Sequence, residues 1–299
     1  MTFTLRLPGS TSNLGSGFDA LGMALSLYNQ AAVAVRDDDV VSVSVSGEGA
    51  GLLPEDDSNL FVTAAREAAG RIGRPLPGFD LEMQNGVPVA RGLGSSATVI
   101  VGGIIATNRM LNGGLSESDM LDIAVKIEGH PDNVSACLKG GLTITAVAGE
   151  VTHCLGVAPV NPPKVVVAFP EFEVKTSDAR KALPTQVSHA DAIYNVSRAS
   201  LLVAALLTGD RGPIREAFND RLHQPYRKSL ITGFQQVIDA GVEAGALAVG
   251  LSGAGPTMLA LTDEDPAGVG AAMVGAWSKL HIRAQAHVLE IDLQGASFV

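Results

Sequence analysis

The sequence predicts an α+β protein of two domains, on three observations. Its 299 residues are about the number at which a single hydrophobic core stops growing. Segments of alternating, β-branched residues are mixed with longer helical segments in both halves, which is typical of α+β layers. Between the halves, Asn161-Pro162-Pro163 interrupts strand and helix alike. We therefore expect an N-terminal domain over residues 1–160 and a C-terminal domain over 161–299.

The N-terminal half is expected to hold a mixed sheet covered by helices. Period-two alternation predicts strands near 2–7, 30–35, 40–45, 79–83 and 142–148. Helical periodicity, caps and glycine stops predict helices over 59–72, 95–110, 116–127 and 133–140. The second of these is apolar nearly all round, which indicates a central, buried helix.

The C-terminal half is expected to be an α/β layer domain. Strands are predicted near 165–169, 246–251, 257–262 and 284–292. Helices are predicted near 176–182, 189–208, 213–218, 228–243 and 266–279. The alternation of the two kinds of element predicts helices layered on a sheet.

Composition excludes several classes of partner. A net charge of −10 argues against nucleic acid, because binding a phosphate backbone needs clustered Lys and Arg. The longest apolar stretches, around 99–106 and 201–207, are shorter than the ~20 residues that span a bilayer, so we expect no membrane partner. Cys137 and Cys154 lack disulfide or metal spacing, and residues 1–7 lack the pattern of a signal peptide. We expect a soluble, cytoplasmic protein.

The most informative segment is Pro88-Val89-Ala90-Arg91-Gly92-Leu93-Gly94-Ser95-Ser96-Ala97, at the start of the buried helix. Glycines let the backbone approach an anion closely, and a helix N-terminus presents unpaired N–H groups. An acidic protein that binds a polyphosphate needs such local positive potential. The segment therefore predicts a phosphate-binding loop.

Three other interpretations of this loop compete. A dinucleotide-binding fingerprint fits only in its loosest form, because no strand directly precedes Gly92 and no acidic residue ends a strand about 20 residues on. A Walker A loop is absent, since Gly-Lys-Ser/Thr occurs nowhere. A Gly/Ser helix cap without a ligand remains open, because these residues favour caps for local reasons.

Four separated motifs resemble those of the GHMP kinases, a family named for galactose, homoserine, mevalonate and phosphomevalonate. They are the loop at 88–97, Pro8-Gly9-Ser10-Thr11-Ser12-Asn13-Leu14-Gly15-Ser16-Gly17-Phe18-Asp19, Glu128-Gly129-His130-Pro131-Asp132-Asn133, and Leu251-Ser252-Gly253-Ala254-Gly255-Pro256-Thr257. Residues 250–254 at the start of the last motif resemble the Gly-x-Ser-x-Gly nucleophile elbow of serine hydrolases. They lack its final glycine and lead into a strand rather than a helix, which argues against a hydrolase. The resemblance implies a two-domain GHMP fold with a ferredoxin-like C-terminal domain.

The resemblance also implies ATP and Mg²⁺ as cofactors. The residues that would bind the nucleotide are Pro88, Arg91, Gly92, Leu93, Gly94, Ser95, Ser96 and Ala97. Ser96 and Glu128 would hold the metal, which takes most of its ligands from phosphates and water. Phosphoryl transfer would then proceed mainly by positioning and charge neutralisation.

The motifs take the form found in GHMP members that phosphorylate L-homoserine. By that resemblance, Asn13, Asp19, His130, Thr176 and Gly253 would line the substrate site, while Arg180 and Arg227 would clamp the carboxylate. Asn133 would contact the hydroxyl, with Arg180 at the reaction centre and Asp132 kept as an alternative base. A homodimer is expected. Another GHMP kinase, for mevalonate or a sugar, and a non-catalytic metabolite sensor are the alternatives.

Overall fold

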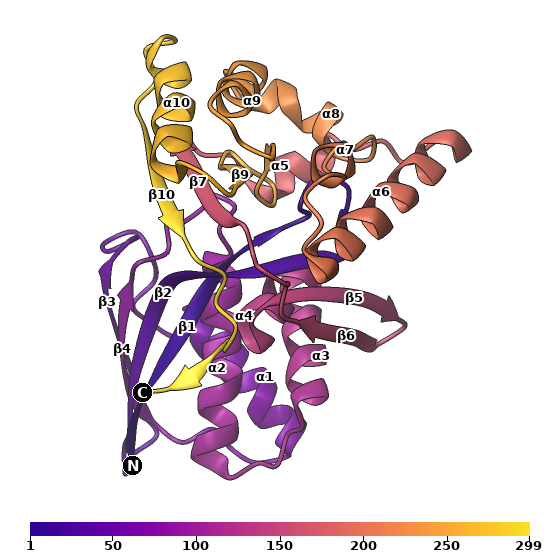
Figure 1. Ribbon diagram of the computed structural model, residues 1–299. Helices are drawn as coiled ribbons and strands as arrows, with labels where there is room; N and C mark the ends of the chain where they lie inside the picture. The colour runs from indigo at the N-terminus through magenta and orange to yellow at the C-terminus, as the bar shows by residue number, and fades with distance from the viewer.

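The computed structural model describes residues 1–299 and confirms a two-domain α+β fold with two separate sheets (Figure 1). The first sheet has seven strands in the order β11-β1-β2-β4-β3, and β5 joins β2 to β6. Only β3 and β4 pair in parallel, so the sheet is mixed. Its strands are β1 (Thr2–Ser12), β2 (Leu21–Val35), β3 (Val41–Gly47), β4 (Phe79–Asn85), β5 (Leu142–Ala148), β6 (Val151–Val157) and β11 (Ser297–Phe298).

Four helices pack on this sheet: α1 (Leu60–Ile72), α2 (Ser95–Leu111), α3 (Glu117–Glu128) and α4 (Asp132–Lys139). Their starts follow local capping, since the Asn59 side chain accepts from the Phe61 N–H and Ser116 forms a reciprocal capping box with Asp119. Helix α2 is buried along most of its length, as its apolar sequence predicts. The loop predicted to bind phosphate is therefore anchored to a buried helix of the domain.

The second sheet is antiparallel, in the order β10-β7-β9-β8. Alternate residues of β7 enter two different cores, Val165 and Val167 on one face and Val166 and Ala168 on the other. Helices α9 and α10 cover the second face and α6 with α7 cover the first. The elements are β7 (Lys164–Pro170), α5 (Thr176–Lys181), α6 (His189–Thr208), α7 (Ile214–Ala217), α8 (Gln224–Arg227), a 3₁₀ turn at Lys228–Leu230, α9 (Phe234–Glu243), β8 (Ala248–Leu251), β9 (Met258–Thr262), α10 (Pro266–Ser278) and β10 (Ala284–Leu289).

The core beneath the first face of the second sheet belongs to both halves of the chain. Leu14, Met23 and Leu25 from the N-terminal half pack with Leu202 and Leu259 from the C-terminal half, all fully buried. The chain end also returns to the first sheet, where β11 pairs with β1 and the C-terminus lies near the N-terminus (Figure 1). The two halves therefore share one continuous interface, and the division at residue 160 stays a prediction.

Some elements differ from expectation. The helix expected over 228–243 is divided into the 3₁₀ turn and α9, because Gly233 adopts a left-handed conformation that starts a new helix. Helix α8, just before the 3₁₀ turn, was not expected. The strand expected to end at Leu7 continues through the motif to Ser12, and β2 begins at Leu21. Strands β6 and β11 were not expected, since each is short or largely exposed and lacks clear alternation.

Helix α6 is long and apolar enough to cross a membrane, judged by length and composition alone. In this fold it contributes Leu202, Ala205 and Leu206 to a core shared with β7 and β9. Its buried Asn195 donates to the Ser16 carbonyl and to Asp220. The helix therefore packs as an element of the C-terminal domain.

Candidate active site

A cavity of about 410 Å³ lies between the two halves of the chain, above the start of α2. It brings together residues from all four sequence motifs, although Asn13 and Gly253, for example, are 240 positions apart. The predicted site residues that line it are Asn13, Asp19, Arg91, Gly92, Gly94, Ser95, Ser96, Glu128, His130, Asp132, Asn133, Thr176, Arg180, Arg227 and Gly253. The patterns in the sequence thus converge on one cavity.

One wall of the cavity is the N-terminus of α2. No side chain caps this helix, and the backbone N–H groups of Ser95, Ser96 and Ala97 have no acceptor within the chain. The helix dipole adds positive potential at the same point. Unpaired donors at the start of a 17-residue helix form a binding site for phosphate oxygens.

Two glycines give this loop its shape. Gly94 has φ of 71°, and a Cβ there would lie 2.2 Å from the Ser10 hydroxyl oxygen. Gly92 has φ of 75°, and its Cβ would lie 2.4 Å from the Ser252 carbonyl oxygen. Both positions require glycine, because a side chain would be strained and would push the loop away from two neighbouring motifs.

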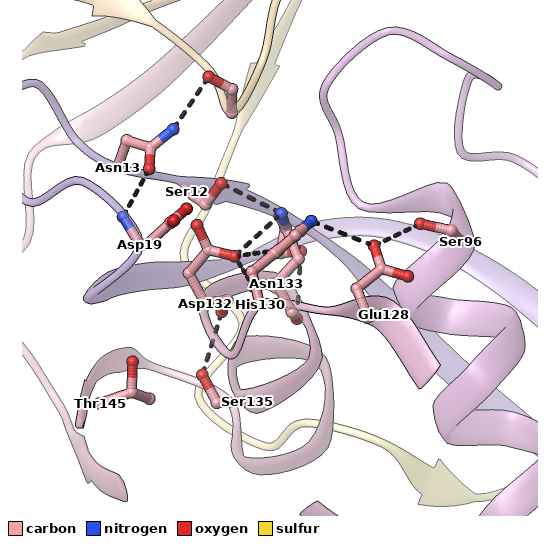
Figure 2. A network of polar contacts seen from close by, with 12 residues as sticks. Ser12, Asn13, Asp19, Ser96, Glu128, His130, Asp132, Asn133, Ser135 and Thr145 are labelled. Carbon is pink, nitrogen blue, oxygen red and sulfur yellow. Dashed lines mark hydrogen bonds and ion pairs between the residues drawn. The ribbon is translucent and has the colours of Figure 1, made fainter. Parts of the chain in front are cut away.

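Ser96 and Glu128 lie together at the side of the loop. The Ser96 hydroxyl donates to Glu128 Oε1 at 2.7 Å, which joins the first turn of α2 to the last residue of α3 (Figure 2). A hydroxyl and one carboxylate are hard oxygen ligands of the kind that Mg²⁺ accepts. No cluster of three or more His, Cys, Asp or Glu residues exists that could hold a metal alone. The donor set fits a cation that takes its other ligands from phosphate and water.

The centre of the site is a network around the fully buried Asp132 (Figure 2). Its Oδ1 lies 2.8 Å from His130 Nδ1 and accepts from the Asn133 backbone N–H, also at 2.8 Å. The Asn133 side chain is fixed in turn, since it accepts from the Ser10 hydroxyl at 2.9 Å and donates to Ser12 Oγ at 3.1 Å. The start of α4 is thereby held against β1.

The charges in this network stabilise each other. Burial opposes the charged form of His130, but the hydrogen bond to Asp132, with the charges of Asp132 and Glu128, raises its pKa above the ordinary value. Burial likewise opposes ionisation of Asp132, and the contacts from His130 and the Asn133 backbone hold its pKa below the usual range. Asp132 is therefore an ionised carboxylate whose Oδ1 already accepts from the Asn133 backbone and contacts His130.

Asp19 and Arg180 face each other across the opposite wall. Arg180 Nη1 lies 3.0 Å from Asp19 Oδ2, and Nη2 lies 2.9 Å from Oδ1. The Asn13 side chain accepts from the Asp19 backbone N–H and donates to the Gly253 carbonyl, so it ties the first motif to the last. Asp19 has φ of 54°, a left-handed conformation that is uncommon for residues other than glycine.

Arg227 is also at the cavity, yet it is only 2% exposed. It forms no ion pair with any carboxylate within 4.0 Å. Burial and the neighbouring guanidinium of Arg180 lower its pKa, as a buried, unneutralised cation requires. Such a group attracts an anion strongly.

Three predicted nucleotide-binding residues lie outside the cavity lining. Leu93 and Ala97 belong to the two hydrophobic cores and Pro88 is buried behind the loop, so these side chains shape the loop from beneath. The Arg91 side chain lines the cavity but donates to the carbonyls of Glu171 and Phe172, which joins the loop to the C-terminal half. The assignment of nucleotide contacts to individual residues stays a prediction.

The cavity is also lined by residues that were not assigned to the site from the sequence. They come from several elements and include Ser12, Leu53, Pro54, Ser58, Asn59, Leu60, Met83, Val89, Ala90, Val99 and Ala254. Their apolar members form a lining suited to a flat ring system next to the phosphate loop. Ser12, Val89, Ala90 and Ala254 lie within the quoted motifs, whereas no local pattern marks the other residues as part of a site.

Comparison with known proteins agrees with this geometry. Residues 59–141 match the model of the GHMP kinases N terminal domain, and residues 202–278 match GHMP kinases C terminal. Homoserine kinase of Trichormus variabilis is 43% identical over 295 residues, covering 98% of both chains. Homoserine kinase of Moorella thermoacetica is 42% identical, covering 93% of this chain and 94% of that one. The crystal structure of homoserine kinase from Cytophaga hutchinsonii superposes with a TM-score of 0.91 at 28% identity, over 100% of this chain and 97% of that one.

Proposed function

The chain belongs to the GHMP kinase family, within its homoserine kinase branch, and we propose that it transfers the γ-phosphoryl group of ATP to the side-chain hydroxyl of L-homoserine. The product is O-phospho-L-homoserine, an intermediate of threonine biosynthesis. Arg227 is the observation that carries the choice of acceptor. A buried guanidinium without a carboxylate partner requires an anionic group on the molecule that fills the cavity.

The acceptor end of the cavity fits an amino-acid zwitterion. Asp19 supplies a carboxylate for an ammonium group, while Arg180 and Arg227 supply two guanidinium groups for a carboxylate. Mevalonate carries a carboxylate but no ammonium group, and a sugar carries neither. The acidic residue beside two arginines therefore favours the amino acid.

The phosphate end fits a nucleoside triphosphate. The free N–H groups at the start of α2 would bind phosphate oxygens, and Ser96 with Glu128 would hold Mg²⁺. When bound, this cation neutralises charge on the β- and γ-phosphates. His130 Nε2 lies 3.8 Å from Glu128 Oε1, the oxygen that also accepts from the Ser96 hydroxyl.

Asn133 lies where the two ends of the cavity meet, at the start of α4 beside Gly94. Its side-chain amide is held between Ser10 and Ser12, and we assign it the contact to the acceptor hydroxyl. We assign no base role to Asp132, because its lowered pKa makes it a weak base and its Oδ1 is engaged by His130 and the Asn133 backbone. Phosphoryl transfer with a loose transition state needs little activation of the nucleophile, so positioning suffices.

The test is an ADP-release assay with purified protein across L-homoserine, L-threonine, mevalonate and galactose. We expect kcat/KM for L-homoserine to exceed that for each other acceptor by about 100-fold or more, because the alternatives leave a buried charge unpaired. Preference for mevalonate or galactose would contradict the amino-acid site. No turnover with any acceptor, together with intact nucleotide binding, would favour a metabolite sensor.

The homodimer stays a prediction from the family resemblance, and so does the cytoplasmic location. Sedimentation velocity on the purified protein decides the oligomeric state, with a monomer near 30.7 kDa as the contrary outcome.

A further inference from the structure

Three acceptors from three separate segments hold the guanidinium of Arg227. Its Nε donates to the Ala179 carbonyl at 3.3 Å, and its Nη1 donates to the Gly253 carbonyl at 3.1 Å and to His223 Nδ1 at 3.3 Å. Its Nη2 has no hydrogen-bond partner within the chain, although the residue lines the cavity. The two N–H donors of Nη2 are therefore left for a ligand, and none of the three anchors carries a full negative charge.

The contacts of His223 fix its tautomer. A guanidinium only donates, so Nδ1 of His223 is the acceptor from Arg227. A carbonyl only accepts, so Nε2, which lies 2.7 Å from the Gly15 oxygen, carries the proton. The side chain is fully buried, and burial lowers its pKa, which agrees with a neutral ring.

Charged groups around this ring do not supply a competing partner. Asp220 Oδ2 lies 3.6 Å from Nε2, but the Asp220 carboxylate already accepts from the backbone N–H groups of Leu222, His223 and Gln224. Arg227 is the cation that faces Nδ1. Protonation of Nδ1 would place two positive charges in contact, so the geometry requires the neutral ring.

The ring of Phe18 also contacts His223 and the Arg227 guanidinium. Its ring stacks on His223 with centroids 5.1 Å apart and an angle of 18°. Cζ of Arg227 lies 5.1 Å from the Phe18 centroid and Cζ of Arg180 lies 5.9 Å from it. Both guanidinium groups therefore lie within reach of one aromatic ring, at distances typical of cation–π contacts.

We propose that His223 and Phe18 are positioning residues, which together hold Arg227 at the angle where its free Nη2 meets the carboxylate of the acceptor. The inference rests on the proposed function, since it assigns that carboxylate to the acceptor substrate. Neither residue touches the reacting atoms. The contact from His223 to Gly15 also links Arg227 to the loop that carries Asp19, so it sets the spacing between the sites for the carboxylate and the ammonium group.

Two substitutions of His223 separate its two hydrogen bonds. In His223→Asn, the amide lies near the position of Nδ1 and keeps an acceptor for Arg227. In His223→Gln, the amide reaches the position of Nε2 and keeps the donor to Gly15 but removes the acceptor. We expect His223→Gln to raise KM for L-homoserine by about 10-fold or more, with kcat and KM for ATP within about threefold. His223→Asn should raise KM for L-homoserine by about threefold or less.

An acceptor without a carboxylate distinguishes the positioning role from a merely structural one. A structural defect would weaken binding of every acceptor, whereas a misplaced Arg227 would weaken binding only of acceptors that carry a carboxylate. 3-Aminopropanol is L-homoserine without that group, and it serves as an alternative substrate or as a competitive inhibitor. We expect its KM or Ki to stay within about twofold of wild type in His223→Gln. Equal losses for L-homoserine and 3-aminopropanol, or no loss for either, would overturn the proposal.

Phe18 provides a second route if the His223 variants fold poorly. Phe18→Leu keeps apolar bulk but removes the ring face, and Phe18→Tyr keeps the face. We expect a selective rise in KM for L-homoserine of about fivefold in Phe18→Leu and within twofold in Phe18→Tyr. If KM for L-homoserine changed equally in Phe18→Leu and Phe18→Tyr, the ring face of Phe18 would have no role in positioning Arg227. If the wild-type protein does not phosphorylate L-homoserine, the proposed function fails; if it does and the variants show no selectivity, only the positioning role fails.

Discussion

Arg180 and Asp19 form a two-pronged ion pair, with both nitrogen–oxygen distances at or below 3.0 Å, at the entrance to the acceptor end of the cavity. The hydrogen bond to Asp19 raises the pKa of Arg180 further above its ordinary value. A zwitterion presents the same two charges in reverse, so it can bind across the pair without leaving either residue unpaired. A ligand with only one charge cannot.

The first prediction follows from this relationship. Arg180→Leu leaves Asp19 without its partner and removes one of two contacts to the acceptor carboxylate. Losing a charge-assisted contact of this kind costs on the order of 2–5 kcal/mol, so we expect kcat/KM for L-homoserine to fall by about 30-fold or more. Arg227→Leu should have a comparable effect, and nucleotide affinity should stay nearly unchanged in both.

Arg283→Leu is the matched control, because Arg283 is 85% exposed and lies away from the site. Its effect should stay within about 0.5 kcal/mol, which is barely twofold. Steady-state kinetics and a separate nucleotide titration measure all three variants. Near-wild-type kcat/KM for L-homoserine in Arg180→Leu and Arg227→Leu would show that these arginines do not bind the acceptor carboxylate.

The second prediction concerns the metal. Ser96→Ala removes a hydroxyl ligand and Glu128→Gln removes the negative charge of the other ligand, each at an exposed or partly exposed position, so the fold should be retained. We expect the Mg²⁺ concentration at half-maximal rate to rise by about 10-fold or more, with partial recovery at saturating Mg²⁺. A titration of rate against Mg²⁺ measures this. Full activity of Glu128→Gln at limiting Mg²⁺ would show that the metal is bound elsewhere.

The third prediction is a pH dependence of stability from His130 and Asp132. The pKa of His130 is raised, so its stabilisation is complete below about pH 6.5 and is lost as pH rises through the higher folded value. The pKa of Asp132 is lowered, so its stabilisation is present above about pH 3.9 and is lost as pH falls through the lower folded value. The pair is therefore strongest between about pH 4 and pH 6.5.

We expect His130→Gln to lower the melting temperature by about 2–4 °C near pH 5.5, and by less at pH 8.5. His153→Gln is the control, because His153 is exposed and takes part in no ion pair. Thermal unfolding at both pH values measures the difference. If the difference in melting temperature between wild type and His130→Gln were equal at the two pH values, His130 would not act through its charge.

The sequence predicted the motif residues of the site better than their surroundings. Gly94 and Ser96 were predictable because a glycine before a helix start and a hydroxyl in its first turn are local patterns. The lining formed by Leu60, Met83 and Val99 was not, because each reads as a core residue of its own element and only the tertiary arrangement opens a cavity between them. The periodicity of a single element does not show whether a cavity will form between that element and its neighbours.

The fold shows the same division. Helix α6 was predicted with its observed bounds because Ser188 caps it and Gly209 ends it, both local signals. Strand β1 was predicted too short, since residues 8–12 contain Pro, Gly and Ser and resemble a loop. Its extension depends on pairing with β2, where a register shift between Pro8 and Ser10 accommodates the motif.

The last prediction separates a base from an orienting group at Asp132. Removal of a general base lowers kcat by roughly 10²–10⁴-fold and abolishes the acid limb of the pH–rate profile. Asp132→Asn keeps an oxygen that accepts from His130 Nδ1 and from the Asn133 backbone N–H, so it preserves most of the network while removing the charge. If Asp132 orients Asn133 and His130, we expect kcat to fall by about 10-fold or less, with the shape of the pH–rate profile unchanged. Asn133→Ala removes the group assigned to the acceptor hydroxyl and should therefore lower kcat more than Asp132→Asn does. A loss of 10³-fold in Asp132→Asn, with the acid limb gone and the Asn133→Ala loss smaller, would instead identify Asp132 as the base.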